Sequence, residues 1–224
     1  MKKATYRQLK DIGIRFLNLD PEGVDGDAIR KGTEGCSVND VDRRLKAFLN
    51  NGLSFMMKGP SALIIDRTKP FNPAAFIGSG WTIWRGTTNG DGLTGEEEQD
   101  ARSLELTEIN FATVLFTACL EDGETSIIGE EKLARHIAAK HIRLDARIGQ
   151  CLFEEKGQAA CEWLYQTFGI RWFELSGTVL RNGFGSRCFL FLYRNNDGRW
   201  YWSYDWLGSN RDAENPSAVL AGST

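Results

Sequence analysis

The sequence has little histidine, proline or cysteine, with two, five and five of these residues in a chain of 224. It also has no apolar run near the roughly 18 residues that a membrane-spanning helix requires, so it predicts no membrane partner. Its first residues carry charge with no apolar stretch behind them, unlike a secretory signal peptide. We therefore expect a soluble protein of the cytoplasm.

The five cysteines show no Cys-x-x-Cys spacing, and their odd number favours reduced thiols over a disulfide scaffold. His136 and His141 lie five residues apart, so they would not share one face of a continuous helix, and neither has a cysteine at ligand spacing. We interpret both as partly exposed imidazoles and predict no metal and no cofactor. Cys151 or Cys161 with His141 is a conceivable nucleophile and base, but neither cysteine has a flanking family signature, so no catalytic residue is predicted.

Two glycine-rich stretches lack the spacing that ligand loops require. The segment SGTVLRNGFG does not place the Gly-x-Gly-x-x-Gly pattern between a strand and a helix, so it predicts no nucleotide site. The segment NGDGLTGEEE resembles a calcium loop, but Leu93 stands where an oxygen ligand is needed if Asn89 is the first ligand. We assign these glycines to turns.

Basic residues are almost absent from one long segment. Residues 86–131 contain twelve acids and a single base, Arg102, which gives this segment a charge of −11 in a chain whose total is −3. A solvated loop with polar strand faces would explain the pattern, and so would a contact surface that steers a basic partner. We favour the contact surface and predict partner-binding residues at its centre: Asp91, Glu96, Glu97, Glu98 and Asp100.

Hydrophobic periodicity predicts an α+β fold, with a helical N-terminal part beside a mostly antiparallel sheet and two or three interposed helices. We expect residues 1–58 to be the helical segment and residues 59–224 to be the α+β domain. Extended segments are expected at 61–67, 74–86, 104–109 and 114–119. Helices are expected at 129–141, from Asp145 to about residue 157, and up to Gly169. Three strands follow, with turns at 184–185 and 196–198, and the last dozen residues are expected to pack loosely.

The predicted N-terminal helices carry many basic side chains, and three short helices of this kind could form a DNA-binding unit. Their acidic residues leave the first fifty residues with a charge of about +2, which is poor for phosphate binding. We therefore prefer an amphipathic helical cap on the sheet.

Aromatic residues are concentrated near the end of the chain. Five of the fifteen residues in GRWYWSYDWLGSNRD, 198–212, are Trp or Tyr. If this segment is a strand, alternation places Trp200, Trp202, Tyr204 and Trp206 on one face. We interpret that face as core, since aromatic cross-strand pairs stabilise sheets. The alternative is a stacking face for single-stranded nucleic acid or carbohydrate, although nearby acids dilute its arginines.

Two segments, GSGWTIWRGTTNGDGLTGEEEQDARSLELTEI and SGTVLRNGFGSRCFLFLYRNNDGRWYWSYDWL, resemble uncharacterised small proteins of bacterial and phage genomes over roughly residues 76–220. The resemblance transfers no catalytic residue. It implies a gene on a mobile element, whose small accessory proteins often bind and block host machinery through acidic surfaces.

Together these features predict a non-enzymatic protein-binding protein whose acidic surface engages a basic surface of a host protein complex. Its most concrete form is an inhibitor of a nucleic-acid-handling or defence complex, of the anti-CRISPR type. The alternative function is nucleic-acid or carbohydrate binding through the aromatic face of residues 200–206.

Overall fold

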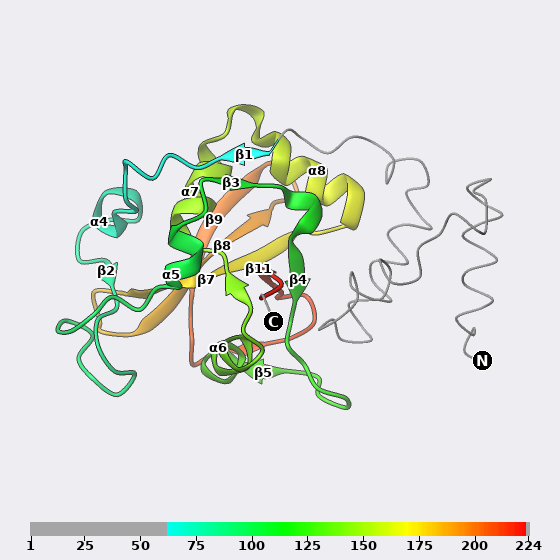
Figure 1. Ribbon diagram of the computed structural model, residues 1–224. Helices are drawn as coiled ribbons and strands as arrows, with labels where there is room; N and C mark the ends of the chain where they lie inside the picture. Colours follow the sequence, from blue (N-terminus) through cyan, green and yellow to red (C-terminus); the bar gives the residue numbers. More distant parts are fainter. Residues whose placement is uncertain (1–61, 223–224) are drawn as a thin grey trace, which may run out of the picture. The chain divides into compact units, whose positions relative to one another are not determined.

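The computed structural model describes residues 62–222, which form a mixed α+β fold around one main sheet (Figure 1). The predicted class is therefore confirmed for these residues. The predicted helical segment, 1–58, and the boundary after it lie outside the described residues. None of the described helices is both long enough and apolar enough to cross a membrane.

The main sheet has seven strands, of which five lie in the order β4-β11-β7-β8-β9, while β2 pairs with β7 and β6 pairs with β11. Its pairings are antiparallel except that β11 runs parallel to β7. The sheet is thus mostly antiparallel, as predicted. Its strands are β2 (Thr82–Ile83), β4 (Leu115–Thr117), β6 (Ile142–Arg143), β7 (Trp172–Arg181), β8 (Arg187–Arg194), β9 (Trp200–Trp206) and β11 (Ser217–Leu220). Two smaller antiparallel pairs join β1 (Leu63–Ile64) to β3 (Glu108–Ile109) and β5 (Ile127–Ile128) to β10 (Asn210–Arg211).

Helices cover both faces of this sheet. The α-helices are α4 (Pro73–Phe76), α5 (Ala101–Leu104), α6 (Gly129–Ala138), α7 (Ala146–Glu154) and α8 (Ala159–Phe168), and the 3-10 turns are η3 (Phe111–Thr113) and η4 (Lys156–Gln158). α7 and α8 bury Ile148 and Leu164 against one face, in the same core as Leu190 of β8. Leu133 of α6 packs with Phe189 of β8 in a second core. Because neighbouring residues of a strand point to opposite faces, α6 covers the face that α7 and α8 leave.

Local sequence signals predicted the start of α7 and the end of α8, and the structure confirms both. The Asp145 carboxylate accepts hydrogen bonds from the backbone N–H groups of Arg147 and Ile148, which would otherwise be unpaired at the start of α7. Gly169 ends α8 in the left-handed conformation, with φ of 68°. The predicted turns between β7, β8 and β9 are confirmed too, with Gly185 and Gly198 at positive φ.

One segment that was expected to be extended and the end of the acidic loop contain helical turns instead. Asn72 accepts a hydrogen bond from the Ala75 N–H, and Pro73 follows it at the first helical position, so residues 73–76 form α4. Asp100 caps Ala101–Leu104 in the same way, by accepting from the Arg102 N–H. Both turns are four residues long, too short to show a helical period in the sequence.

The end of the chain is also packed differently from the prediction. Instead of forming a loose end, β11 lies inside the sheet between β4 and β7, and its residues Ala218 and Val219 are fully buried. β7 bulges between Leu175 and Leu180, where the main chain of β6 approaches it. A Cβ atom on Gly177 would lie 2.1 Å from the Arg143 carbonyl oxygen, so this approach requires glycine.

Candidate functional site

The loop of residues 86–97 holds the predicted acidic centre, and its base is fixed by main-chain hydrogen bonds. The N–H groups of Arg85 and Gly86 donate to the carbonyls of Gly92 and Glu96, at 3.0 and 2.9 Å. Gly92 lies against Trp84 with φ of 74°, and a Cβ atom there would lie 2.4 Å from the indole ring. Only glycine fits this contact, so the loop leaves the sheet in a defined direction.

Three of the five predicted acids are exposed on or beside this loop. Asp91 accepts a hydrogen bond from the Leu93 N–H in a local turn, and Glu96 faces solvent. Glu97 forms an ion pair of 2.5 Å with Arg85 and also accepts from Gln99. These three carboxylates are accessible to a partner.

The other two predicted acids are occupied inside the molecule. Both oxygens of Glu98 accept hydrogen bonds from Arg187, whose guanidinium group lies over the Trp84 ring. Asp100 is only 5% exposed, pairs with Arg102 at 2.9 Å and accepts from the Arg143 N–H. Glu98 and Asp100 therefore hold the sheet and the 98–104 segment together through arginines of the same chain.

The surroundings of Asp100 lower its pKa. Burial raises the pKa of this carboxyl group, but hydrogen bonds from the Arg102 side chain and from the Arg143 N–H, with the charges of both arginines, outweigh that effect. Asp100 thus stays ionised at neutral pH.

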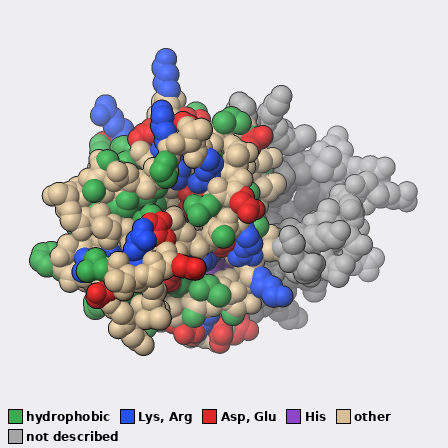
Figure 2. All heavy atoms as spheres, turned by 60° about the vertical axis from the view of Figure 1, so that its left-hand side comes forward, with side chains coloured by type: hydrophobic (Ala, Val, Ile, Leu, Met, Phe, Trp, Pro, Cys, Tyr) green, Lys and Arg blue, Asp and Glu red, His purple; other side chains and the backbone are tan. Residues whose placement is uncertain are grey.

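Figure 2 shows the end of the molecule that carries α4, β2 and the 86–97 loop. On the described residues in this view, acidic side chains are interspersed with basic and hydrophobic ones and gather at the lower edge. This face of the described residues is therefore not uniformly acidic.

The β7–β8 hairpin places an aromatic side chain beside this loop. Phe184, at the tip of the hairpin, is 98% exposed. The Asn182 side chain fixes the turn by accepting from the N–H groups of Phe184 and Ser186, at 3.0 and 2.8 Å. Arg181 then joins hairpin to loop by donating to the Asp91 carbonyl at 2.8 Å. We name Asp91, Glu96, Glu97 and Phe184 the hairpin–loop surface.

The predicted aromatic face of β9 changes from buried to exposed along the strand. Trp200 is 2% exposed within the main core, and Trp202 packs against Phe76 of α4 with ring centroids 4.8 Å apart. Tyr204 contacts Trp81 at 4.2 Å but remains half exposed, and Trp206 is 56% exposed. One half of this face is core and the other half is surface.

The opposite face of the sheet carries a second row of rings that the sequence analysis did not single out. Trp172, Phe191, Tyr193 and Tyr201 form a chain of contacts with centroid separations of 4.7, 5.8 and 5.9 Å. All four are partly exposed. We name these residues the aromatic row. They come from three neighbouring strands, and alternation alone could not show which part of this face α6 leaves uncovered.

An open groove of about 630 Å³ lies beside α4, and three arginines are among the residues that line it. Arg67 is bound by both oxygens of Asp145, and Arg85 is paired with Glu97. Arg147 donates to the Gln150 side chain and the Asp66 carbonyl. The structure thus uses all three guanidinium groups to join segments of the fold.

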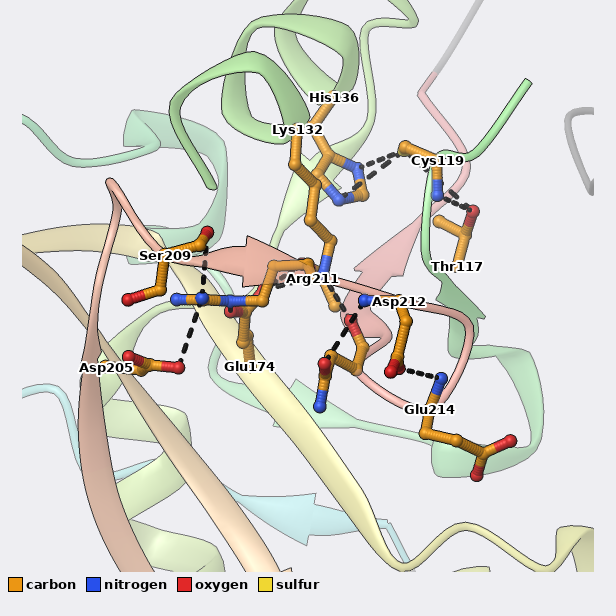
Figure 3. A network of polar contacts seen from close by, with 12 residues as sticks. Thr117, Cys119, Lys132, His136, Glu174, Asp205, Ser209, Arg211, Asp212 and Glu214 are labelled. Atoms are coloured by element: carbon orange, nitrogen blue, oxygen red, sulfur yellow. Dashed lines mark hydrogen bonds and ion pairs between the residues drawn. The ribbon is translucent and has the colours of Figure 1, made fainter. Parts of the chain in front are cut away.

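A buried network joins α6 to the sheet (Figure 3). Glu174 accepts from Lys132 and Ser217 through one oxygen and from Arg211 through the other, at 2.6, 3.0 and 2.5 Å. Arg211 also pairs with Asp205 at 3.1 Å. Burial lowers the pKa of Lys132, against the attraction of Glu174. We interpret this network as structural, since Lys132, Glu174 and Arg211 are almost completely buried.

Both histidines lie close to this network, which corrects the expectation of exposed imidazoles that do not meet. Lys140 has φ of 55° and turns the chain back after α6, so His141 Nδ1 lies 3.1 Å from His136 Nδ1. Cys119 Sγ lies 3.4 Å from the same His136 nitrogen (Figure 3). Burial and the charge of Lys132 lower the pKa of His136 well below its usual value, so the ring is neutral at neutral pH.

The two cysteines that were considered as nucleophiles lie elsewhere. Cys161 is fully buried in α8 and Cys151 is half-buried in α7. Burial raises the pKa of both thiols, which disfavours the reactive thiolate. Within residues 62–222, one group of three His, Cys, Asp or Glu side chains could hold a metal ion. It consists of Cys119, His136 and His141. Cys119 and His136 are 17 positions apart, which is not a ligand spacing that a sequence motif would show.

Comparison with family models, curated proteins and solved structures finds no match for this chain.

Proposed function

We propose that this chain is a non-enzymatic protein-binding protein and that the hairpin–loop surface is its contact site. The observation that carries the proposal is Phe184, a large apolar side chain 98% exposed on a turn that Asn182 holds in place. Aromatic residues are enriched among the few that dominate binding energy in protein interfaces. Burying a phenylalanine side chain stabilises a complex by about 1.5–3 kcal/mol.

The charges of the loop that Arg181 joins to the hairpin indicate the chemistry of the partner. Asp91 and Glu96 are exposed, and Glu97 is paired with the surface residue Arg85. Such a rim favours a basic partner surface with an apolar socket, and it accelerates association at low salt.

The concrete form of this function is inhibition of a host nucleic-acid-handling or defence complex. Proteins of that kind expose basic surfaces that grip phosphates, and spaced carboxylates compete for the same surface. In this chain Asp91, Glu96 and Glu97 would make that contact. Glu98 and Asp100 would support the loop from inside.

The test is affinity capture from bacterial lysate, with the full chain as bait and washes at low and high salt. We expect one stoichiometric protein complex that salt releases and that the Phe184→Ser and Glu96→Lys variants fail to capture. The matched controls are Ile64→Ser, at another exposed apolar residue, and Glu105→Lys, at an exposed acid outside the surface. Recovery of nucleic acid or of nothing, or equal capture by all four variants, would contradict the proposal.

The aromatic row favours a second candidate function, the binding of single-stranded nucleic acid. It lies on a sheet face, as in modules that stack bases on exposed rings. A groove of about 320 Å³ beside it is lined in part by Trp172, Tyr193 and Arg171. Arg171 and Arg199 are exposed near the row, as are Asp197 and Glu214.

Titration with short oligonucleotides, followed by tryptophan fluorescence, tests this second function. Tyr193→Ala should weaken binding by about 1–3 kcal/mol, the usual contribution of one stacked base. Tyr204→Ala, on the opposite face, is the control and should leave the affinity unchanged. The absence of fluorescence quenching at low salt would exclude this function.

A further inference from the structure

Three side chains from separate parts of the chain place a sulfur and two nitrogens together. Cys119 follows β4, His136 lies in α6 and His141 follows the turn after that helix. Their donor atoms all lie within 4.8 Å of one another. The two histidine Nδ1 atoms are 3.1 Å apart, and Cys119 Sγ lies 3.4 Å from that of His136.

Two of the three separations are close to those of ligands around a tetrahedral zinc ion. Zinc lies about 2.0–2.1 Å from a nitrogen ligand and about 2.3 Å from a thiolate, so tetrahedral angles place two nitrogens about 3.3 Å apart and a sulfur and a nitrogen about 3.6 Å apart. The observed 3.1 and 3.4 Å differ from these values by only a few tenths of an ångström. Cys119 Sγ also lies 3.6 Å from His136 Nε2, nearly as close as to Nδ1, so the imidazole and the thiol must rotate before Sγ and Nδ1 can bind one ion.

The backbone holds the sulfur toward the histidines. Cys119 has φ of 56°, a left-handed conformation that costs energy for any residue with a Cβ atom. Its N–H donates to Thr117 Oγ1 at 3.1 Å, and its carbonyl accepts from Arg135 at 3.0 Å. The strained residue is thus held on both sides.

The basic side chains that face Cys119, His136 and His141 are each paired with a carboxylate. Lys132 is paired with Glu174, and Arg102 and Arg143 are both paired with Asp100. A Cys119 thiolate would therefore supply the negative ligand. A donor set of one sulfur and two imidazoles suits zinc and not magnesium or calcium, which bind oxygen.

We propose that Cys119, His136 and His141 bind one zinc ion. Three protein ligands leave a fourth position, which water can occupy. The ion would join β4, α6 and the start of β6, so its first effect is to stabilise the sheet against α6.

The test uses the full chain, purified with a chelator and kept reduced, with Co²⁺ as a spectroscopic substitute for zinc. We expect uptake of one Co²⁺ per chain, with a sulfur-to-cobalt charge-transfer band and the intense visible bands of tetrahedral Co²⁺. Zinc should displace the cobalt and raise the melting temperature. Cys151→Ser, at another half-buried cysteine, is the matched control and should behave like the wild type.

Two variants make the outcome decisive. Cys119→Ser should lose the charge-transfer band, and His141→Asn should bind Co²⁺ at least about tenfold more weakly while circular dichroism shows that both are folded. If either variant does not fold, the presence or absence of the charge-transfer band in the wild type decides whether Cys119 binds the metal. A folded wild type without the band, or a band that persists in Cys119→Ser, would overturn the proposal.

Discussion

Lys132 and Glu174 form an ion pair of 2.6 Å in which both side chains are fully buried. The lysine comes from α6 and the glutamate from β7, so the pair joins the helix to the middle of the sheet. Arg211 binds the other oxygen of the same carboxylate. A single buried anion therefore serves two buried cations.

Because of this arrangement, we expect loss of the Glu174 charge to destabilise the fold strongly. Glu174→Gln leaves Lys132 and Arg211 buried without their shared charge, and breaking a buried pair in this way costs about 3–5 kcal/mol. Urea unfolding at neutral pH measures the loss. Glu162→Gln removes a pair with Arg194 nearer the surface, and it should cost less than about 1 kcal/mol. Equal losses in the two variants would contradict the structural role of Glu174.

Asp100 predicts a dependence of stability on pH. Its pKa is lower in the folded chain than the ordinary 3.8, because Arg102 and Arg143 favour the ionised form despite burial. The group therefore stabilises the fold above about pH 3.8, and this contribution is lost as the pH falls through the lower folded value. Asp100→Asn should lower the free energy of unfolding by about 1–3 kcal/mol at neutral pH.

Denaturant unfolding at a series of pH values checks this prediction. The difference between the wild type and Asp100→Asn should shrink as the pH falls below 3.8. A difference that stayed constant down to about pH 2 would show that the carboxylate charge is not what stabilises this contact.

The aromatic residues of β9 differ in burial, so we expect their replacement to destabilise the fold to different extents. Trp200→Ala should cost about 3–5 kcal/mol because the ring lies in the main core. Trp206→Ala should stay within about 0.5 kcal/mol because its ring is mostly exposed. Thermal unfolding of the two variants under the same conditions is the measurement. A large cost at Trp206 would indicate that its ring is covered in solution.

The bulge in β7 makes a prediction about one glycine. Gly177→Ala would place a methyl group 2.1 Å from the Arg143 carbonyl oxygen, so β6 must move away from β7. Overpacking of this kind typically costs about 1–3 kcal/mol. Gly183→Ala, where a Cβ atom meets nothing within 4 Å, is the control for the lost flexibility of glycine. The two melting temperatures should differ by several degrees.

Much of the secondary structure could be predicted because its signals are local. Asp145 begins α7 through hydrogen bonds that span three residues, and Gly169 ends α8 through its own φ angle. The three long strands and their turns follow from alternation and from glycines at positive φ. β11 could not be predicted in its place, because four residues become a strand only when β4 and β7 provide partners on both sides.

The candidate sites also contain features that could be predicted from the sequence and features that depend on the fold. The acidity of residues 86–131 and the aromatic content of residues 200–206 are facts of composition, so they could be read before any fold was known. The binding of Glu98 and Asp100 by arginines from distant segments, and the exposure of Glu96, depend on how the chain folds. The tertiary structure also brought Cys119, His136 and His141 together, because a turn at Lys140 and the packing of α6 act across segments that share no sequence period.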